Sequence, residues 1–426
     1  MRGTRPYPSI LINLLNAAGA TLQRAGLPLV RLDERELLDT ACRQTGLRDF
    51  GDGSFREPLR ILLRAYESEA QLTLVGRLAA RRDTLRLLTN RLRLVADRKR
   101  HPDIAAQEIR QPLFIVGLPR TGSTLLHHLL AQDPSNRVPL SWEVMFPSPP
   151  PERASYEDDP RIAAAQRLLN RFDRLTPHFK IIHPTHARWP IECMAILSHT
   201  FASPQFQSMY YVPSYQRWLS YKDLRPVYAF HRRFLQHLQW RCPAERWVLK
   251  APSHLFALDA LLATYPDACM IQTHRDPRAV VASVASLDAV LRRVFSHRVN
   301  PKQIGLEALQ QWASALERAM QIRDRTNGAP GRSLDVYYTG LVRDPIATVR
   351  RIYAHCDLRF TDEVETRMRR FLAAYPKDQH GVHRYSLAQF GLSPDEVALR
   401  FHAYVARFNP EPEVGGRRDQ NHVVES

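Results

Sequence analysis

Hydrophobic positions recur every three or four residues through the first part of the chain. Leucines keep this spacing from Leu59 to Lys99, and Asp33 precedes an earlier run at the place of a helix N-cap. The pattern predicts an all-helical region over residues 1–109. We expect this region to act as a cap or as an oligomerisation surface.

A different pattern begins at Pro112. Short, continuous apolar runs lead into helical stretches at four places: Leu113–Gly117, Trp247–Leu249, Cys269–Gln272 and Leu334–Tyr338. Such runs are typical of parallel strands that are buried on both faces, and their alternation with helices favours right-handed crossovers. We therefore predict an α/β fold over residues 110–408, with a P-loop-like parallel sheet of about five strands flanked by helices. A polar tail follows over residues 409–426.

Charge and cysteine usage narrow the classes of protein. The chain has 60 Lys and Arg against 43 Asp and Glu, a formal charge of +17, but no basic block of the kind that forms a nucleic-acid tail. We expect no nucleic-acid partner. The five cysteines are an odd number, are widely separated and form no CxxC pair. They indicate a reducing compartment and hence a cytoplasmic location.

The stretch Ser9–Gln23 is apolar enough to be compared with a membrane span or a signal peptide. Asn13 and Asn16 interrupt it and Arg24 ends it, so it is too short and too polar to cross a bilayer. Its apolar residues lie at helical spacing. We expect a helix and no stable membrane span, with a signal peptide as the alternative.

The strongest local motif is a glycine-bracketed loop between the first apolar run and a helix start. Gly117, Gly122 and Thr124 match the nucleotide-binding pattern GxxxxGK[ST], whereas Ser123 stands where the lysine belongs. That lysine serves the β and γ phosphates of ATP, so its replacement disfavours an ATPase. Arg120, backbone N–H groups and hydroxyls could still hold a less charged anion without a metal. A tight turn without a ligand is the alternative.

At this point the chain resembles the PAPS-dependent sulfotransferase family, especially its bacterial branch and the tyrosylprotein sulfotransferases. The resemblance runs from Pro112 to Phe408 and rests on two blocks, Pro119–Thr124 and Thr273–Ser283. It implies an enzyme that moves a sulfuryl group from 3′-phosphoadenosine 5′-phosphosulfate (PAPS) to an acceptor hydroxyl or amine. The residues implied to bind the 5′-phosphosulfate are Arg120, Thr121, Gly122, Ser123 and Thr124, and those implied to bind the 3′-phosphate are Arg275 and Ser283.

The resemblance also suggests catalytic residues. Glu143 lies 23 residues after Arg120, near the place of the family's catalytic glutamate, and is the predicted general base. Lys250 ends a predicted central strand and is expected to stabilise the leaving group. His254 is the second candidate for the base. Tyr338 is expected near the nucleotide, although the next residues depart from the family's Tyr-Glu-Asp-Leu.

Two further segments carry weaker expectations. The segment Lys377–Tyr385 resembles a late cofactor-closing loop, with His383 and Arg384 as contacts. The long helical insert between the first two apolar runs contains the proline cluster Pro147–Pro151 and should supply the acceptor pocket or its lid. Its aromatic residues suggest a small-molecule, glycan or lipid acceptor with an apolar or ring-containing body: Trp189, Phe201, Tyr210, Tyr211 and Trp218.

Other functions remain as alternatives. A P-loop nucleotide kinase or ATPase would use the glycine loop, and a non-catalytic basic binding protein would explain the charge. His274-Arg275-Asp276 copies the HRD of protein kinases, but Val281 stands where that loop needs Asn. No HExxH or Cys/His spacing predicts a metal site, and Ser253 is not in a GxSxG elbow.

Overall fold

The computed structural model describes residues 30–325, 333–374 and 385–412, together with Asn16, Ala17, Gly19 and Thr21. Most of Ser9–Gln23, the residues His383 and Arg384, and residues 413–426 of the predicted tail lie outside this part of the chain. None of the helices in the described ranges combines the length and the apolar run that a bilayer crossing requires.

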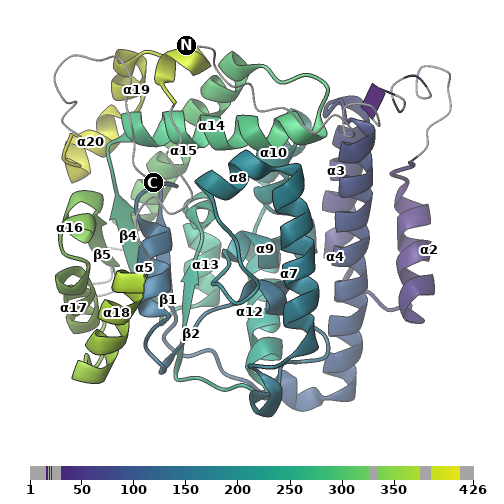
Figure 1. Cartoon of the computed structure of the whole chain (residues 1–426), viewed down its shortest axis with the longest axis horizontal. Helices are drawn as coiled ribbons and strands as arrows, with labels where there is room; N and C mark the ends of the chain where they lie inside the picture. The colour runs from purple at the N-terminus through teal and green to yellow at the C-terminus, as the bar shows by residue number, and fades with distance from the viewer. Residues whose placement is uncertain are drawn as a thin grey trace.

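A parallel sheet of five strands forms the centre of the molecule (Figure 1). The spatial order of the strands is β2-β3-β1-β4-β5, and their bounds are Leu113–Gly117 (β1), Asn136–Arg137 (β2), Arg246–Lys250 (β3), Cys269–His274 (β4) and Ser333–Tyr337 (β5). The four predicted runs are confirmed as strands. The fifth, β2, has two residues, which is too short for an apolar run to reveal.

The sheet is covered on both faces because successive side chains of each strand point to opposite sides. Leu113 and Ile115 of β1 join the core formed with α5, α17 and α18. Phe114 and Val116 join the core formed with α12, α13, α14 and α15. The bounds of these helices are Ser123–Leu130 (α5), Arg225–Gln239 (α12), Leu258–Thr264 (α13), Pro277–Phe295 (α14), Pro301–Arg325 (α15), Pro345–His355 (α17) and Asp362–Ala374 (α18).

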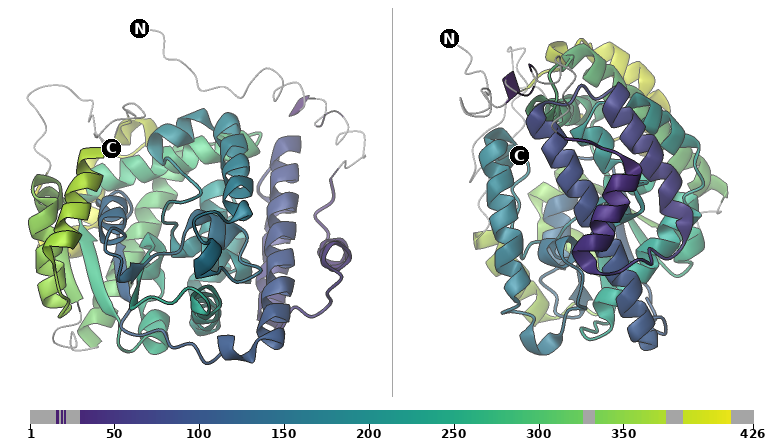
Figure 2. Two further views of the ribbon diagram at one scale, coloured as in Figure 1. Left: turned by 60° about the horizontal axis from the view of Figure 1, so that its bottom comes forward. Right: turned by 90° about the vertical axis from the view of Figure 1, so that its right-hand side faces the viewer.

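The N-terminal region is helical, as predicted, and lies along one side of the molecule (Figure 2). The Asp33 side chain accepts from the N–H of Glu36 at 2.8 Å and caps the first of its helices. These helices are Glu34–Thr45 (α2), Arg56–Ser68 (α3) and Leu74–Arg100 (α4). Leu59 and Leu87 share one core with Phe201 and Tyr210 of the long insert. Those two aromatic residues are therefore structural core residues.

The remaining α-helices lie in the insert between β1 and β3 and in the C-terminal part of the chain. Their bounds are Ser141–Met145 (α6), Pro160–Leu175 (α7), Pro177–Ile182 (α8), Cys193–Leu197 (α9), Gln205–Met209 (α10), Pro213–Tyr221 (α11), Tyr338–Arg343 (α16), Pro394–Arg400 (α19) and His402–Phe408 (α20). The 3-10 helices are Gly53–Phe55 (η1), Pro102–Ile104 (η2), Arg153–Ser155 (η3), Ser198–Thr200 (η4), Pro252–Phe256 (η5) and Leu387–Phe390 (η6).

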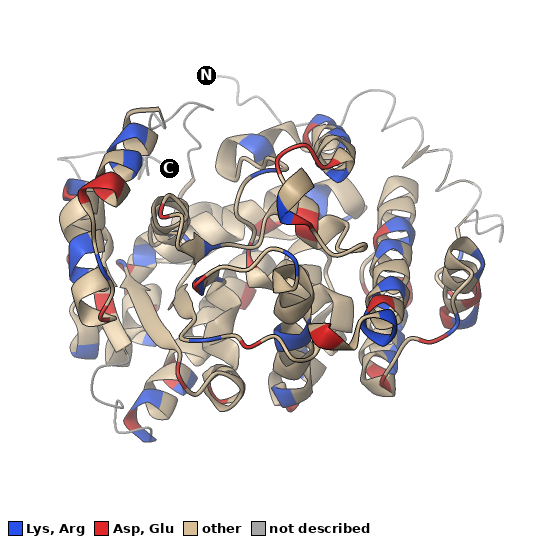
Figure 3. Ribbon diagram, turned by 90° about the horizontal axis from the view of Figure 1, so that it is seen from below, with Lys and Arg blue, Asp and Glu red and all other residues tan. Residues whose placement is uncertain are grey.

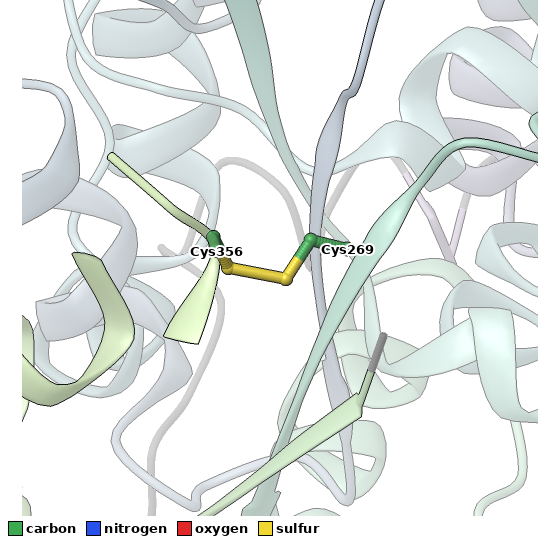
Figure 4. Close-up of a disulfide and its surroundings, with 2 residues drawn as sticks. All are labelled: Cys269 and Cys356. Carbon is green, nitrogen blue, oxygen red and sulfur yellow. A yellow bond between two sulfur atoms is a disulfide. The ribbon is translucent and has the colours of Figure 1, made fainter. Parts of the chain in front are cut away.

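Cys269 at the start of β4 and Cys356 after α17 form a disulfide (Figure 4). The two residues are 87 positions apart in sequence, so their spacing gave no sign of the pairing. The other three cysteines are free. Disulfides are rare in reducing compartments, so this pairing is a feature that cysteine count and spacing did not predict, while the cytoplasmic location stays a prediction.

Charged residues of both signs are interspersed along the outer helices in the view from below (Figure 3). On α18, Arg367 pairs with Glu363 and Arg369 pairs with Glu365, each across one helical turn. On this helix, therefore, arginines are partly neutralised by local ion pairs.

Candidate active site

Four strands of the sheet end side by side at one edge, which we call the carboxyl edge. Parallel pairing aligns Gly117 at the end of β1 with Thr273 of β4, and Ile115 of β1 with Lys250 of β3. Arg275 follows β4, and Tyr338 follows β5. Ligands gather at this edge in open parallel sheets. The candidate site is therefore assembled by strand register.

The loop after β1 turns sharply through three left-handed residues, with φ of 132° at Gly117, 64° at Arg120 and 80° at Gly122. The Thr121 hydroxyl donates to the Leu118 carbonyl at 2.7 Å and ties the loop together. No side chain caps the start of α5, which begins at Ser123. Its first N–H groups are directed at the loop, where they could bind an anion.

A substitution at Gly117 would test how closely this loop packs against β4. A Cβ at this position would lie 2.4 Å from the Thr273 carbonyl oxygen, and φ of 132° is unfavourable for other residues. We expect Gly117→Ala to lower the free energy of unfolding by about 2 to 3 kcal/mol, measured by urea titration. Gly340→Ala is the control, since nothing lies within 4 Å of its Cβ. Equal stability of the two variants would contradict this account of the loop.

Arg275 connects the two blocks that were singled out in the sequence. Its Nη1 donates to the carbonyl oxygen of Arg120 at 2.6 Å, and its guanidinium lies 3.9 Å from the ring centre of Tyr338. The residue is 5% exposed, so it is not a surface arginine at a capped helix. The glycine loop and the Arg275 block are therefore adjacent.

Ser283 lies near the start of α14, after the Asp276 side chain has capped that helix by accepting from the N–H of Arg278. The Ser283 hydroxyl is buried and has no hydrogen-bond partner among the described residues. A buried hydroxyl without a partner is costly, so it suggests a bound polar group. Arg275 directly precedes the N-cap Asp276, and Ser283 is the seventh residue of α14, about two turns into the helix.

Lys250 is held at the carboxyl edge by two contacts. Its ammonium lies 2.5 Å from the Glu192 carboxylate and donates to the Thr124 hydroxyl at 3.3 Å. Glu192 precedes α9 in the long insert, and its side chain is 19% exposed. Burial raises its pKa, but Lys250, His183 and Arg120 outweigh burial and hold the pKa below the ordinary value. Glu192 is therefore an ionised carboxylate next to the proposed leaving-group lysine.

Sequence reasoning did not find Glu192. It lies in a helical insert without strand periodicity, and nothing in Pro190-Ile191-Glu192-Cys193 indicates which strand end it faces. The sequence indicated only that this insert should supply the acceptor pocket or its lid.

Two histidines complete the surroundings of Lys250. Burial lowers the pKa of His183 to about 4, and Glu192, Lys250 and Arg120 also act on it electrostatically. Burial, Lys250 and His183 lower the pKa of His128 to about 4. Both imidazoles are therefore neutral at pH 7, so they add no positive charge to the site.

Glu143 has other partners. Its carboxylate lies 2.5 Å from the guanidinium of Arg137 and accepts from the N–H of Leu140 at 3.0 Å. Arg137 stacks on Trp247, which precedes Lys250 by three residues along β3, or about 10 Å in an extended strand. The carboxylate is fully buried. The structure therefore brings Glu192, and not Glu143, into contact with Lys250.

His254 lies in the core. Its Nδ1 is 2.7 Å from the Tyr228 hydroxyl, and its ring stands edge-on to Phe114 at 5.1 Å. Burial holds its pKa well below the ordinary value. Phe114 faces the core of α12 and α13, whereas Lys250 contacts Thr124 of α5. Thus His254 is not gathered with the residues around Lys250.

Comparison with known proteins decides the family. A model of the sulfotransferase family matches residues 112–362, more than half of the chain. The chain belongs to the sulfotransferase family. This membership favours an enzyme over the nucleotide kinase and the non-catalytic binding protein that the sequence left open.

Solved sulfotransferases share the fold over most of their length. Sulfotransferase STF1 from Mycobacterium tuberculosis H37Rv is 36% identical, with 87% of this chain and 98% of that chain covered and a TM-score of 0.78. Sulfotransferase STF9 from Mycobacterium avium is 30% identical, with 89% and 98% covered and a TM-score of 0.83. Both similarities extend well beyond residues 112–362.

A curated relative has a more specific name. The omega-hydroxy-beta-dihydromenaquinone-9 sulfotransferase Stf3 of Mycobacterium tuberculosis is 26% identical over 312 residues, which cover 71% of this chain and 77% of that protein. In the sulfotransferase described here, no group of three or more His, Cys, Asp or Glu within the described ranges is arranged to hold a metal ion.

Proposed function

We propose that this sulfotransferase uses PAPS as the donor and binds it across the carboxyl edge. The glycine loop with Arg120, Thr121, Gly122, Ser123 and Thr124 would hold the 5′-phosphosulfate. Arg275 and Ser283 would hold the 3′-phosphate. The observation that carries the proposal is the hydrogen bond from Arg275 to the Arg120 carbonyl, because it makes two cationic, donor-rich groups neighbours. The buried, unpartnered Ser283 hydroxyl supports it.

In the proposed reaction, the acceptor oxygen forms a bond to sulfur while the bond between sulfur and the bridging oxygen of PAPS breaks. The electron pair of that bond stays on the 5′-phosphate and gives 3′,5′-adenosine bisphosphate. Lys250 neutralises the charge that grows on the bridging oxygen. A carboxylate takes the proton that the acceptor loses.

We assign the proton acceptor to Glu192. Its carboxylate is ionised, contacts Lys250 and is partly exposed, so a substrate could reach it. Glu143, the assignment from spacing, is the competing hypothesis, although its carboxylate is fully buried against Arg137. His254 is a third and less favoured choice because of its burial among aromatic rings.

For the acceptor, we propose a lipid or another apolar alcohol. The name of the relative Stf3 gives it an omega-hydroxy menaquinone derivative as substrate. Here, Trp189 of the insert stands edge-on to His128 at 5.3 Å, and His128 in turn stacks on Phe371 at 5.7 Å. This aromatic group is next to Lys250, whose charge acts on His128. Rings beside the reacting groups fit an apolar acceptor.

A cytoplasmic location is part of the same hypothesis, because the five cysteines are odd in number and widely spaced. It requires the sulfotransferase to work with Cys269 and Cys356 reduced, since glutathione keeps cytosolic thiols reduced.

Ligand-dependent thermal stability tests the donor without knowledge of the acceptor. We expect 3′,5′-adenosine bisphosphate at 100 times its Kd to stabilise the protein by about 2.7 kcal/mol, seen as a rise in Tm. ATP with magnesium is the comparison ligand. A larger rise with ATP than with the bisphosphate would overturn the PAPS assignment and favour a nucleotide kinase.

A further inference from the structure

The C-terminal helix α20 packs against the end of β4, directly beside the candidate 3′-phosphate residue Arg275. This helix, His402–Phe408, lies beyond the part of the chain that matches the sulfotransferase family model, residues 112–362. Figure 1 shows α20 beyond β4, close to α14 and α15. A segment outside the matched region therefore reaches the carboxyl edge.

A chain of hydrogen bonds joins the helix to the strand end. The Tyr404 hydroxyl lies 3.1 Å from Nδ1 of His274, and Nε2 of His274 lies 2.9 Å from the Asp335 carboxylate. Arg323 holds that carboxylate with two hydrogen bonds, at 2.8 and 3.1 Å. Burial raises the pKa of the same hydroxyl, and the backbone N–H of Arg275 lowers it. The hydrogen-bonded chain thus runs from β5 through His274 to Tyr404, and Arg275 directly follows His274 in the sequence.

Chemistry fixes the direction of each bond. Burial raises the pKa of Asp335, but His274 and Arg323 outweigh burial and hold it far below its usual value, so the carboxylate only accepts. Nε2 of a neutral His274 must then donate to Asp335, which leaves Nδ1 to accept from the Tyr404 hydroxyl. The hydroxyl oxygen keeps a lone pair for the N–H of Arg275. Every member has a partner, which favours one rigid arrangement.

Ring packing fixes the helix in the same place. The ring of Phe408 stacks on His274 with centres 4.3 Å apart, and the ring of Tyr404 also stacks on His274, with centres 5.7 Å apart. The Tyr337 hydroxyl donates to the Phe408 carbonyl at 2.9 Å. His274 is 1% exposed and Tyr404 is 2% exposed. The position of Tyr404 is therefore set by packing, independently of any ligand.

We propose that Tyr404 is a positioning residue: its hydroxyl and ring hold His274, and thereby the backbone of the adjacent Arg275, so that the guanidinium points at the 3′-phosphate. Helix α20 then determines how strongly the sulfotransferase prefers nucleotides with a 3′-phosphate over nucleotides without one. This inference rests on the proposed function, since it assumes that Arg275 meets that phosphate. Tyr404 touches neither the nucleotide nor the reacting atoms.

The test compares two nucleotides that differ only in the 3′-phosphate. Calorimetry on the full chain would give Kd for 3′,5′-adenosine bisphosphate and for adenosine 5′-monophosphate. We expect Tyr404→Phe to weaken binding of the bisphosphate about fivefold, the effect of one hydrogen bond, and to leave Kd for the monophosphate unchanged. Equal weakening of both ligands, or of neither, would overturn the proposal.

Tyr353→Phe is the matched control. Tyr353 lies on α17, elsewhere in the fold. Like Tyr404 it is buried, and its hydroxyl donates a hydrogen bond, in this case to the Asp133 carboxylate. Both variants lose one buried hydroxyl, so a general loss of stability would lower Tm in both. Only Tyr404→Phe should change the ratio of the two Kd values. A change of the same size in Tyr353→Phe would also overturn the proposal.

A double variant shows whether Tyr404 acts through Arg275. If it does, Tyr404→Phe in an Arg275→Ala background should cause no further loss of bisphosphate affinity. An additive loss would mean that Tyr404 does not act through Arg275. The wild-type ratio is read separately: a protein that does not discriminate between the two nucleotides would contradict the proposed function itself, whatever the variants do.

Discussion

Replacing Glu192 with glutamine is expected to lower kcat about a thousandfold, because glutamine keeps the shape of the side chain but cannot accept the acceptor's proton. Binding of 3′,5′-adenosine bisphosphate should change little, since Glu192 contacts Lys250 and not the proposed phosphate residues. The measurement is transfer of radiolabelled sulfate from PAPS to a panel of long-chain alcohols and phenols.

Glu143→Gln separates the two candidates for the base. Glu143 neutralises the buried guanidinium of Arg137, so its replacement should lower Tm by leaving that charge without its carboxylate. At a temperature where the variant is folded, we expect kcat to stay within severalfold of the wild type. The opposite result, with Glu143→Gln inactive and Glu192→Gln active, would return the catalytic role to Glu143.

Acidification is expected to destabilise the protein strongly between pH 6.5 and about 4. Burial lowers the folded-state pKa of several histidines, among them His128 and His183 to about 4, and His199 and His231 to about 3. The unfolded chain then binds these protons first, so their stabilising effect is complete above pH 6.5 and is lost as pH falls. At pH 5.5 each of these four costs about 1.4 kcal/mol, or about 6 kcal/mol together.

Urea unfolding at pH 7.5, 6.5 and 5.5 would measure this loss, which is comparable to the whole stability of many domains. Asp288 acts in the opposite direction. Burial raises its pKa to about 7, so its protonation in acid stabilises the folded protein relative to the unfolded chain. His231→Gln should lower by one the number of protons taken up on unfolding, so the free energy of unfolding should depend less on pH. His297→Gln, at an exposed position, should not. A free energy of unfolding that is constant from pH 7.5 to 5.5 would contradict the prediction.

The fold and half of the site followed from local sequence. The apolar runs located four strands, and because parallel strands end at one edge, they also placed Lys250, Arg275 and Tyr338 near the glycine loop. That inference needs only strand positions and a common direction. It did not require knowledge of how the helices of the insert pack.

The rest depended on long-range packing that local patterns do not encode. Glu192 and Lys250 are 58 positions apart in sequence. Their contact depends on how the helices between them pack, which the residue pattern of β3 does not indicate. The Glu143 prediction used its distance along the chain from Arg120, which does not specify the direction of a side chain on the short helix α6. Cys269 and Cys356 meet because α17 packs on the sheet near the start of β4.

The contact between Arg275 and the Arg120 carbonyl also bears on the entropy of binding. A guanidinium that is already fixed by a backbone oxygen, an aromatic ring and a neighbouring helix loses little rotational freedom when a phosphate arrives. If the glycine loop and Arg275 bind the two phosphates as proposed, they do so at a preset separation, which acts as a ruler: a rigid ligand of matching length gains affinity from that preorganisation. Nucleotides with only one of the two phosphates would use half of the ruler, which is a physical basis for choosing the donor over more abundant adenine nucleotides.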